Sequence, residues 1–111
     1  MKIKYKEDIE VPVKKVSELG KLSGLMFRTK ETKSLLFEFK NKTRLGIHSF
    51  FVMFPFLAVW TDKSNQVIEF RVVESFSPII RPKKPFTKLV EIPLNNKNKK
   101  IVEFFVGEGK V

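Results

Sequence analysis

The sequence predicts a mainly-β fold, a small single-domain barrel or sandwich of about seven to eight short, mostly antiparallel strands with one short helix near residues 17–23. Three observations predict this fold. Apolar and polar residues alternate with a period of two along most of the chain, whereas no helical pattern extends beyond about ten residues. Twelve phenylalanines, in a chain with 42% hydrophobic residues, supply a core. The length of 111 residues suits one domain spanning residues 1–111.

The N-terminal segment has the pattern of edge strands. Ile3 and Tyr5 alternate with lysines, which discourage pairing with another sheet. Pro12 lies between two valines and cannot donate a backbone hydrogen bond. Its segment is therefore predicted to be a second edge strand or an extended connection.

The predicted helix follows this segment. Ser17 has the residue type of an N-cap, and Leu19 and Leu22 are spaced to share one helical face. Gly24 is placed to end the helix.

The middle of the chain is its most apolar part. A strand that begins at Leu35 is expected to end at a turn at residues 41–42. In residues 46–60 both faces of the predicted strand are apolar, so it is covered on both sides or lines a pocket or an interface. Pro55 interrupts this segment, and a tight bend is expected to make it a hairpin. Residues 62–65 have the composition of a turn.

The remaining segments continue the alternation. The strand after this turn is predicted to place Glu69 and Arg71 on a solvent face. Three prolines and three basic residues make residues 77–86 a stiff surface loop. Two more strands are predicted at residues 87–92 and 101–106.

Composition excludes several kinds of chemistry. The chain has no cysteine, which excludes disulfides, thiolate nucleophiles and zinc fingers. With one histidine and two aspartates, we expect no metal site and no cofactor. No window has the roughly 20 apolar residues that a membrane span requires. The N-terminus lacks a signal-peptide pattern, so a cytoplasmic protein is expected.

The net charge of +10, from 22 basic and 12 acidic residues, favours a polyanionic partner. Only four of the basic residues are arginines, the residue type that suits bidentate recognition of phosphates and bases. A lysine-rich, solvated surface is therefore the competing interpretation.

Six segments in fixed order resemble an uncharacterised-protein family. They are GLMFR, LLFEF, IHSFFVMFPFLAVWTD, QVIEF, LVEIP and VGEG. Together they resemble the family known as domain of unknown function 192, over roughly residues 19–111, and the resemblance implies a compact, mostly-β domain without assigning an activity. The chain departs from the family pattern at Ala58, where the family usually has an aspartate, and also at Asn95 and Glu108. If that aspartate takes part in any chemistry in the family, this chain cannot carry out that chemistry in the same way, because alanine has no carboxylate.

The leading hypothesis is a small, non-enzymatic binding domain for an unknown small ligand or protein. An apolar strand with no polar face lies in the sequence near an apolar loop that ends in arginine, so a cleft is predicted between the GLMFR loop and the 46–60 hairpin. The predicted cleft residues are Met26, Phe27, Arg28, His48, Phe51, Met53 and Trp60. The alternative for these side chains is ordinary core packing, with His48 as a hydrogen-bonded structural residue.

Two other functions remain open. Nucleic-acid binding would use two basic loops, at residues 81–84 and 97–100, if these converge. The residues concerned are Arg81, Lys83, Lys84, Lys97, Lys99 and Lys100. A hydrolase would use His48 with a glutamate such as Glu91. An exposed strand edge or the face of Phe51 could equally be a homodimer surface.

Overall fold

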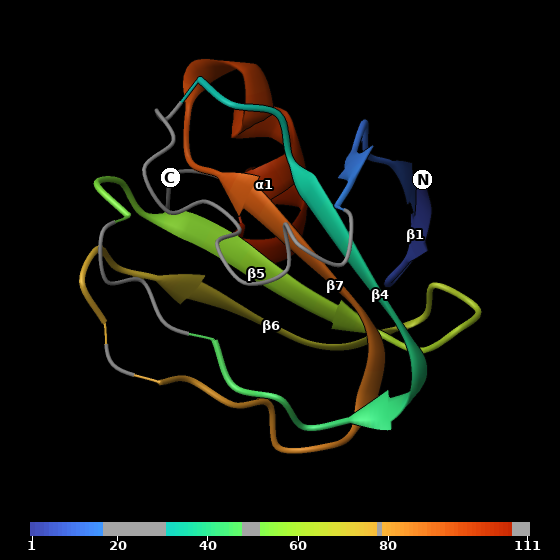
Figure 1. The fold of residues 1–111 in the computed structure, drawn as a ribbon. Helices are drawn as coiled ribbons and strands as arrows, with labels where there is room; N and C mark the ends of the chain where they lie inside the picture. Colours follow the sequence, from blue (N-terminus) through green and yellow to red (C-terminus); the bar gives the residue numbers. More distant parts are fainter. Residues whose placement is uncertain (17–30, 48–51, 78, 108–111) are drawn as a thin grey trace.

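The described residues fold around a five-stranded sheet (Figure 1). The structure is a computed structural model that describes residues 1–16, 31–47, 52–77 and 79–107. In chain order the elements are β1 (Lys2–Lys4), β2 (Asp8–Glu10), β3 (Lys14–Lys15), β4 (Leu35–Thr43), β5 (Phe56–Thr61), β6 (Val67–Val73), β7 (Phe86–Pro93), the 3₁₀ turn η2 (Asn96–Asn98) and α1 (Lys99–Val106).

The last strand in sequence, β7, lies at the centre of the sheet. The strand order is β3-β4-β7-β5-β6. β7 pairs antiparallel with both β4 and β5, β5 pairs antiparallel with β6, and the short β3 runs parallel to β4. A separate hairpin pairs β1 with β2. β3 and β6 are therefore edge strands, and the described strands do not close into a barrel.

A tight turn joins β5 to β6. The Asp62 carboxylate accepts hydrogen bonds at Oδ1 from the backbone N–H groups of Ser64 (2.8 Å) and Gln66 (3.0 Å). Asn65 adopts a φ of +68°, a left-handed conformation that asparagine tolerates better than most residues. The turn predicted at residues 62–65 is confirmed.

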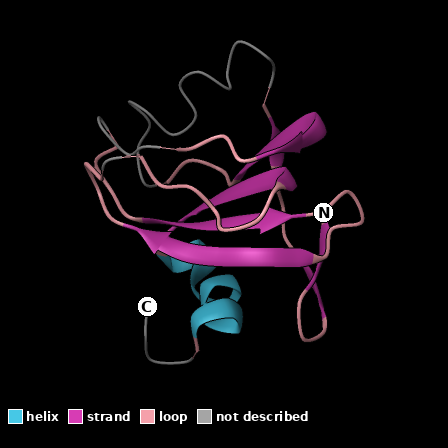
Figure 2. Cartoon of the chain, turned by 90° about the horizontal axis from the view of Figure 1, so that it is seen from below, coloured by secondary structure: helices cyan, strands magenta, loops and turns pink. Residues whose placement is uncertain are grey.

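The sheet separates two apolar clusters, because side chains alternate between its faces along each strand. Figure 2 shows α1 against one face, and described loops on the other side of the sheet. On the helix face, Leu57 and Val90 pack with Val102 and Phe105 of α1. The opposite face, which we call the distal face, carries the second cluster, which includes Phe56, Ala58, Trp60, Phe86 and Leu89.

The prediction of a mainly-β fold is confirmed. The described part of the chain contains seven strands and one short α-helix. The helix predicted near residues 17–23 lies outside the described residues.

Residues 99–106 form α1, so the strand predicted at residues 101–106 is wrong. Val102 and Phe105 are three residues apart, and a helix places both on the side that packs against the sheet. A strand would point them to opposite faces. The Asn95 side chain accepts a hydrogen bond from the backbone N–H of Asn98 (2.9 Å), so the polar run before α1 begins the helical turn.

The hairpin predicted for residues 46–60 is also wrong. β5 lies between β7 and β6, so neighbouring strands occupy both of its edges. Residues 52–54 belong to no strand, and residues 48–51 lie outside the described residues.

The turn predicted at residues 41–42 is wrong as well. β4 continues to Thr43. Its pairing with β7 shifts register between Glu38 and Thr43, so the polar residues there occupy an irregular part of the strand.

Candidate binding face

Three side chains from three neighbouring strands lie in one row on the distal face. Glu91 of β7 is directly opposite Ala58 of β5, and Ala58 is directly opposite Arg71 of β6. Neighbouring strands lie roughly 5 Å apart, so the backbones of Glu91 and Arg71 are about 10 Å apart. Only the methyl group of Ala58 lies between them in this row. The aspartate that the family resemblance leads us to expect at position 58 would directly face Glu91.

Glu91 is buried in the middle of the sheet, with 6% of its surface exposed. Within the described part of the chain, its carboxyl has no hydrogen-bond or ion-pair partner. Burial raises the pKa of the Glu91 carboxyl from its ordinary value of 4.5 to about 8, because an apolar environment disfavours the charged form. At neutral pH this carboxyl is mostly protonated, so it can both donate and accept a hydrogen bond.

Trp60 is fully buried on the same face, two residues along β5 from Ala58. Its Nε1–H finds no hydrogen-bond partner among the described residues. The Arg71 guanidinium lies over the indole, 6.0 Å from the ring centroid, and Phe86 meets the ring edge-on at 6.4 Å between centroids. Because Trp60 pairs with Leu89, it is a diagonal neighbour of Glu91, at roughly 7–8 Å.

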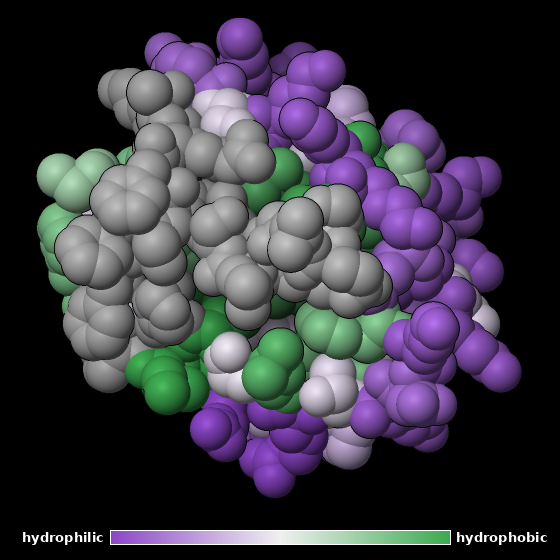
Figure 3. All heavy atoms as spheres, in the orientation of Figure 1, coloured by the Kyte–Doolittle hydropathy of each residue, from purple (hydrophilic) through white to green (hydrophobic). Residues whose placement is uncertain are grey.

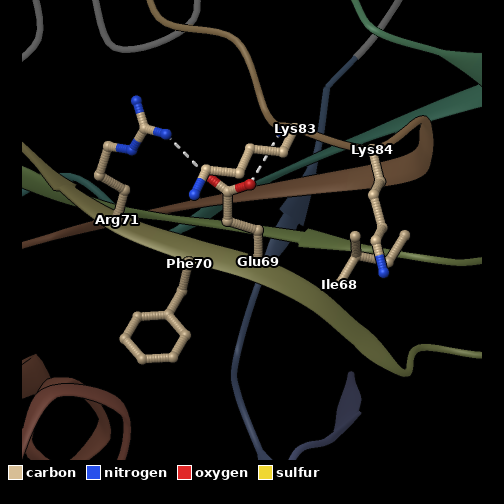
Figure 4. Close-up of a pocket in the computed structure, with 6 residues that line it drawn as sticks. All are labelled: Ile68, Glu69, Phe70, Arg71, Lys83 and Lys84. Carbon is tan, nitrogen blue, oxygen red and sulfur yellow. Dashed lines mark hydrogen bonds and ion pairs between the residues drawn. The ribbon is translucent and has the colours of Figure 1, made fainter.

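A pocket of about 440 Å³ opens at the edge strand β6. Glu69 organises it: Oε2 accepts a hydrogen bond from Nη2 of Arg71 (2.7 Å), and Oε1 accepts one from the backbone N–H of Lys83 (2.9 Å). Figure 4 shows Glu69 and Arg71 pointing toward the loop that carries Lys83, whereas Phe70 points the other way. The lining residues are Ile68, Glu69, Phe70, Arg71, Lys83 and Lys84.

Most of the predicted cleft cannot be placed. Five of its residues lie outside the described residues, namely Met26, Phe27, Arg28, His48 and Phe51. Of the other two, Met53 is 71% exposed and Trp60 is fully buried, so they have opposite environments. The cleft stays a prediction.

The two predicted basic runs lie on opposite sides of the sheet (Figures 1 and 2). The first run precedes β7, in a loop whose Ile80 packs on the distal cluster. The second run leads into α1, which packs on the helix face. The runs therefore do not form one stripe. Arg44 lies beside the first run, because its Nη2 and Nε donate hydrogen bonds to the carbonyl oxygen of Pro82 in that loop (3.3 and 3.4 Å).

Figure 3 views the distal face. Hydrophobic residues gather on its lower left side, and hydrophilic residues cover the right edge and the bottom of the view. The large hydrophobic side chains that are exposed among the described residues are Leu45, Met53, Val72, Phe76 and Ile79.

Sequence reasoning missed Glu69 and Arg71, which it assigned to a solvent face, and considered Glu91 only as a partner of His48. A signal for Glu91 was present, because LVEIP places a glutamate inside an apolar strand, where an unpaired charge is rare. No comparable signal existed for Glu69. Its role depends on Lys83, fourteen residues away, folding back against β6.

The described residues contain no group of three or more histidine, aspartate or glutamate side chains that could hold a metal ion. They also contain no helix that is both long enough and apolar enough to cross a membrane.

Comparison with known proteins identifies the fold and no family. No family model matches the chain, and no curated protein matches it. A protein of unknown function from Novosphingobium aromaticivorans DSM 12444 superposes with a TM-score of 0.72 at 12% identity, over 91% of this chain and 75% of that one. A candidate transcription regulator from Sinorhizobium meliloti 1021 superposes with a TM-score of 0.73 at 16% identity, over 91% of this chain and 82% of that one. At such identities, these similarities concern the fold alone.

Proposed function

We propose that this chain is a small, non-enzymatic binding domain that holds a ligand against the distal face, with Glu91 and Trp60 as its polar contacts. The proposal rests on two polar groups that lie on one face of the sheet: the buried indole N–H of Trp60, which has no hydrogen-bond partner among the described residues, and the buried Glu91 carboxyl, whose pKa is raised by burial. Leaving such a group unpaired costs about 1–3 kcal/mol, so folded proteins retain few of them. A ligand that bonds to both groups would remove this cost.

The chemistry of the two groups favours a neutral, hydrogen-bonding ligand. The indole N–H of Trp60 can only donate, whereas the protonated carboxyl of Glu91 donates and accepts. A primary carboxamide matches both, because its oxygen accepts and its NH₂ group donates. Ala58, which lies directly opposite Glu91, occupies little space beside it. The site shares Trp60 with the cleft that the sequence predicts.

Trp60 provides a direct test, because it is the only tryptophan and gives a single indole N–H resonance. We expect benzamide to shift this resonance saturably in the wild-type protein. Glu91→Leu, which removes the polar contact and keeps an apolar side chain, should weaken binding at least tenfold, the factor that corresponds to about 1.4 kcal/mol. Glu7→Leu is the matched control, because Glu7 is exposed and lies outside the sheet.

Benzoate and benzylamine, titrated in parallel, show whether charge matters. The proposal predicts the order benzamide, benzoate, benzylamine at pH 6, where Glu91 is protonated. It is wrong if none of the three probes shifts the resonance saturably, or if Glu91→Leu binds benzamide as well as the wild type.

Nucleic-acid binding by the first basic run is the second candidate function. The observation that favours it is Phe76, which is 53% exposed and has a φ of +59°. This conformation is unfavourable for a bulky residue and is often retained at functional sites. An exposed aromatic ring can stack on a base, while Arg81, Lys83 and Lys84 contact phosphates.

Salt dependence and charge-matched variants test this second function. Binding of a single-stranded oligonucleotide should weaken with salt at a log–log slope of about −0.7 per phosphate contacted. Replacing Lys83 and Lys84 by alanine should reduce the slope, and replacing Lys99 and Lys100, on the other side of the sheet, should not. Equal effects of both replacements would indicate a response to net charge only.

The hydrolase hypothesis stays a prediction. His48 lies outside the described residues.

A further inference from the structure

The pocket at β6 has a fixed framework. Both oxygens of the Glu69 carboxylate are occupied, one by the Arg71 guanidinium and the other by the backbone of Lys83. The Glu69 side chain is only 18% exposed. One carboxylate thus joins the strand to the loop and fixes the direction of the guanidinium, which also rests on the Trp60 ring.

Cationic donors remain free within this framework. Arg71 uses Nη2 for Glu69, and its side chain is 40% exposed, so its other N–H groups can reach a ligand. The ammonium groups of Lys83 and Lys84 line the same pocket and have no partner in the described part of the chain. Three cations therefore surround one carboxylate, and each oxygen of that carboxylate already accepts one hydrogen bond.

We infer that this pocket is an anion site for a phosphate group, with Arg71, Lys83 and Lys84 as its contacts and Glu69 as a positioning residue. A phosphate dianion balances the excess of two positive charges and offers enough oxygens for donors on two sides. A guanidinium held in place is preorganised for such an oxyanion. The site is separate from the hydrogen-bonding contacts of Glu91, so the inference does not depend on the proposed carboxamide ligand.

Inorganic phosphate is the first probe. Its binding is measured at low salt through the shifts of the backbone amide resonances of Lys83 and Lys84. We expect saturable binding by the wild type. Replacing both Lys83 and Lys84 by glutamine should weaken it at least tenfold. The same replacement at Lys99 and Lys100 removes equal charge on the other side of the sheet and should change it less than twofold.

Glu69→Gln separates positioning from simple electrostatics. The substitution removes a negative charge beside the pocket, so electrostatics alone predicts tighter phosphate binding. Positioning predicts weaker binding, because glutamine has a single acceptor oxygen and so can accept a hydrogen bond from Arg71 or from the backbone of Lys83, but not from both. Weaker binding by at least threefold supports the assigned role, and tighter binding refutes it.

Two further probes identify the source of the phosphate. Glycerol 2-phosphate represents a free phosphate ester, and an oligothymidylate without terminal phosphates represents a nucleic-acid backbone. The probe that binds more tightly to the wild type identifies the class of ligand, provided that replacing Lys83 and Lys84 by glutamine weakens its binding at least tenfold. The inference is overturned if neither these probes nor inorganic phosphate binds saturably, or if the two lysine pairs are equivalent.

Discussion

Glu91 occupies a position that glutamate rarely takes in a folded protein. Its strand, β7, has a neighbour on each side, and the residues directly opposite it are Leu35 and Ala58. On the distal face, the other charged group in this row is Arg71 of β6, whose partner Glu69 lies opposite Trp60. Ionising Glu91 would therefore place a charge in apolar surroundings without a direct partner among the described residues. The carboxyl avoids this by remaining protonated.

The free energy of unfolding should consequently depend on pH in a predictable direction. The folded chain keeps the Glu91 proton up to a pKa of about 8, and the unfolded chain releases it near 4.5. The contribution of Glu91 to stability is fully present below pH 4.5 and is lost as pH rises to about 8. The loss is at most about 5 kcal/mol, at 1.36 kcal/mol for each pKa unit.

Urea unfolding between pH 4 and pH 9 measures this dependence, with Glu91→Gln as the comparison. The variant cannot ionise at this position, so it should lose less stability across the range and exceed the wild type above pH 8. Parallel pH profiles of the two proteins would show that Glu91 does not titrate as described.

At the scale of elements, α1 contributes to stability mainly through the residues that it buries. Phe105 and Val102 belong to the cluster on the helix face. Phe105 also stacks with Tyr5, at 5.5 Å between ring centroids, and so joins α1 to the N-terminal segment. A strand at residues 101–106 would neither bury Val102 and Phe105 in the same cluster nor stack Phe105 on Tyr5.

Truncation of Phe105 tests this packing. Phe105→Ala should destabilise the fold by about 3–5 kcal/mol, as expected for a buried phenylalanine. Phe104→Ala is the matched control. Its side chain is only partly buried, so its loss should be clearly smaller. Similar losses measured by urea unfolding would contradict the orientation of α1.

The sequence was informative where strands alternate and misleading where they do not. The strands around residues 35–40, 56–61 and 87–92 follow from short alternating or apolar runs between turn residues. The segment 101–106 was misassigned because a short apolar run with two adjacent phenylalanines fits either a strand or a helix. The choice between strand and helix depends on which side chains pack against the sheet, and this is known only once the sheet has formed.

The same reasoning explains what could be predicted of the sites. Trp60, Lys83 and Lys84 attract notice from residue type alone. The partners that give them a role, Glu69 and Arg71, are identified only by the register of β6 and by a loop that folds back on it. Hydrophobic periodicity contains neither kind of information.

At the scale of the whole molecule, the two edges of the sheet are protected in different ways. β3 has two residues, both exposed lysines, and a short charged strand discourages pairing. β6 is tied through Glu69 to the loop at Lys83. The net charge of +10 adds repulsion between copies.

We therefore expect a monomer in solution at low salt. Sedimentation velocity over a hundredfold range of concentration should give one species with the mass of a single chain, about 13.0 kDa. The homodimer surface that the sequence leaves open is the alternative. A concentration-dependent dimer would indicate that an edge strand or an exposed apolar side chain is an interface.

On the distal face, the Glu91 carboxyl is protonated and no ion-pair partner for it lies among the described residues. A pH titration of its side-chain carboxyl carbon by NMR, in protein labelled with ¹³C, measures this property at the atom concerned. We expect a midpoint near pH 8. A midpoint near 4.5, the ordinary value for glutamate, would contradict it.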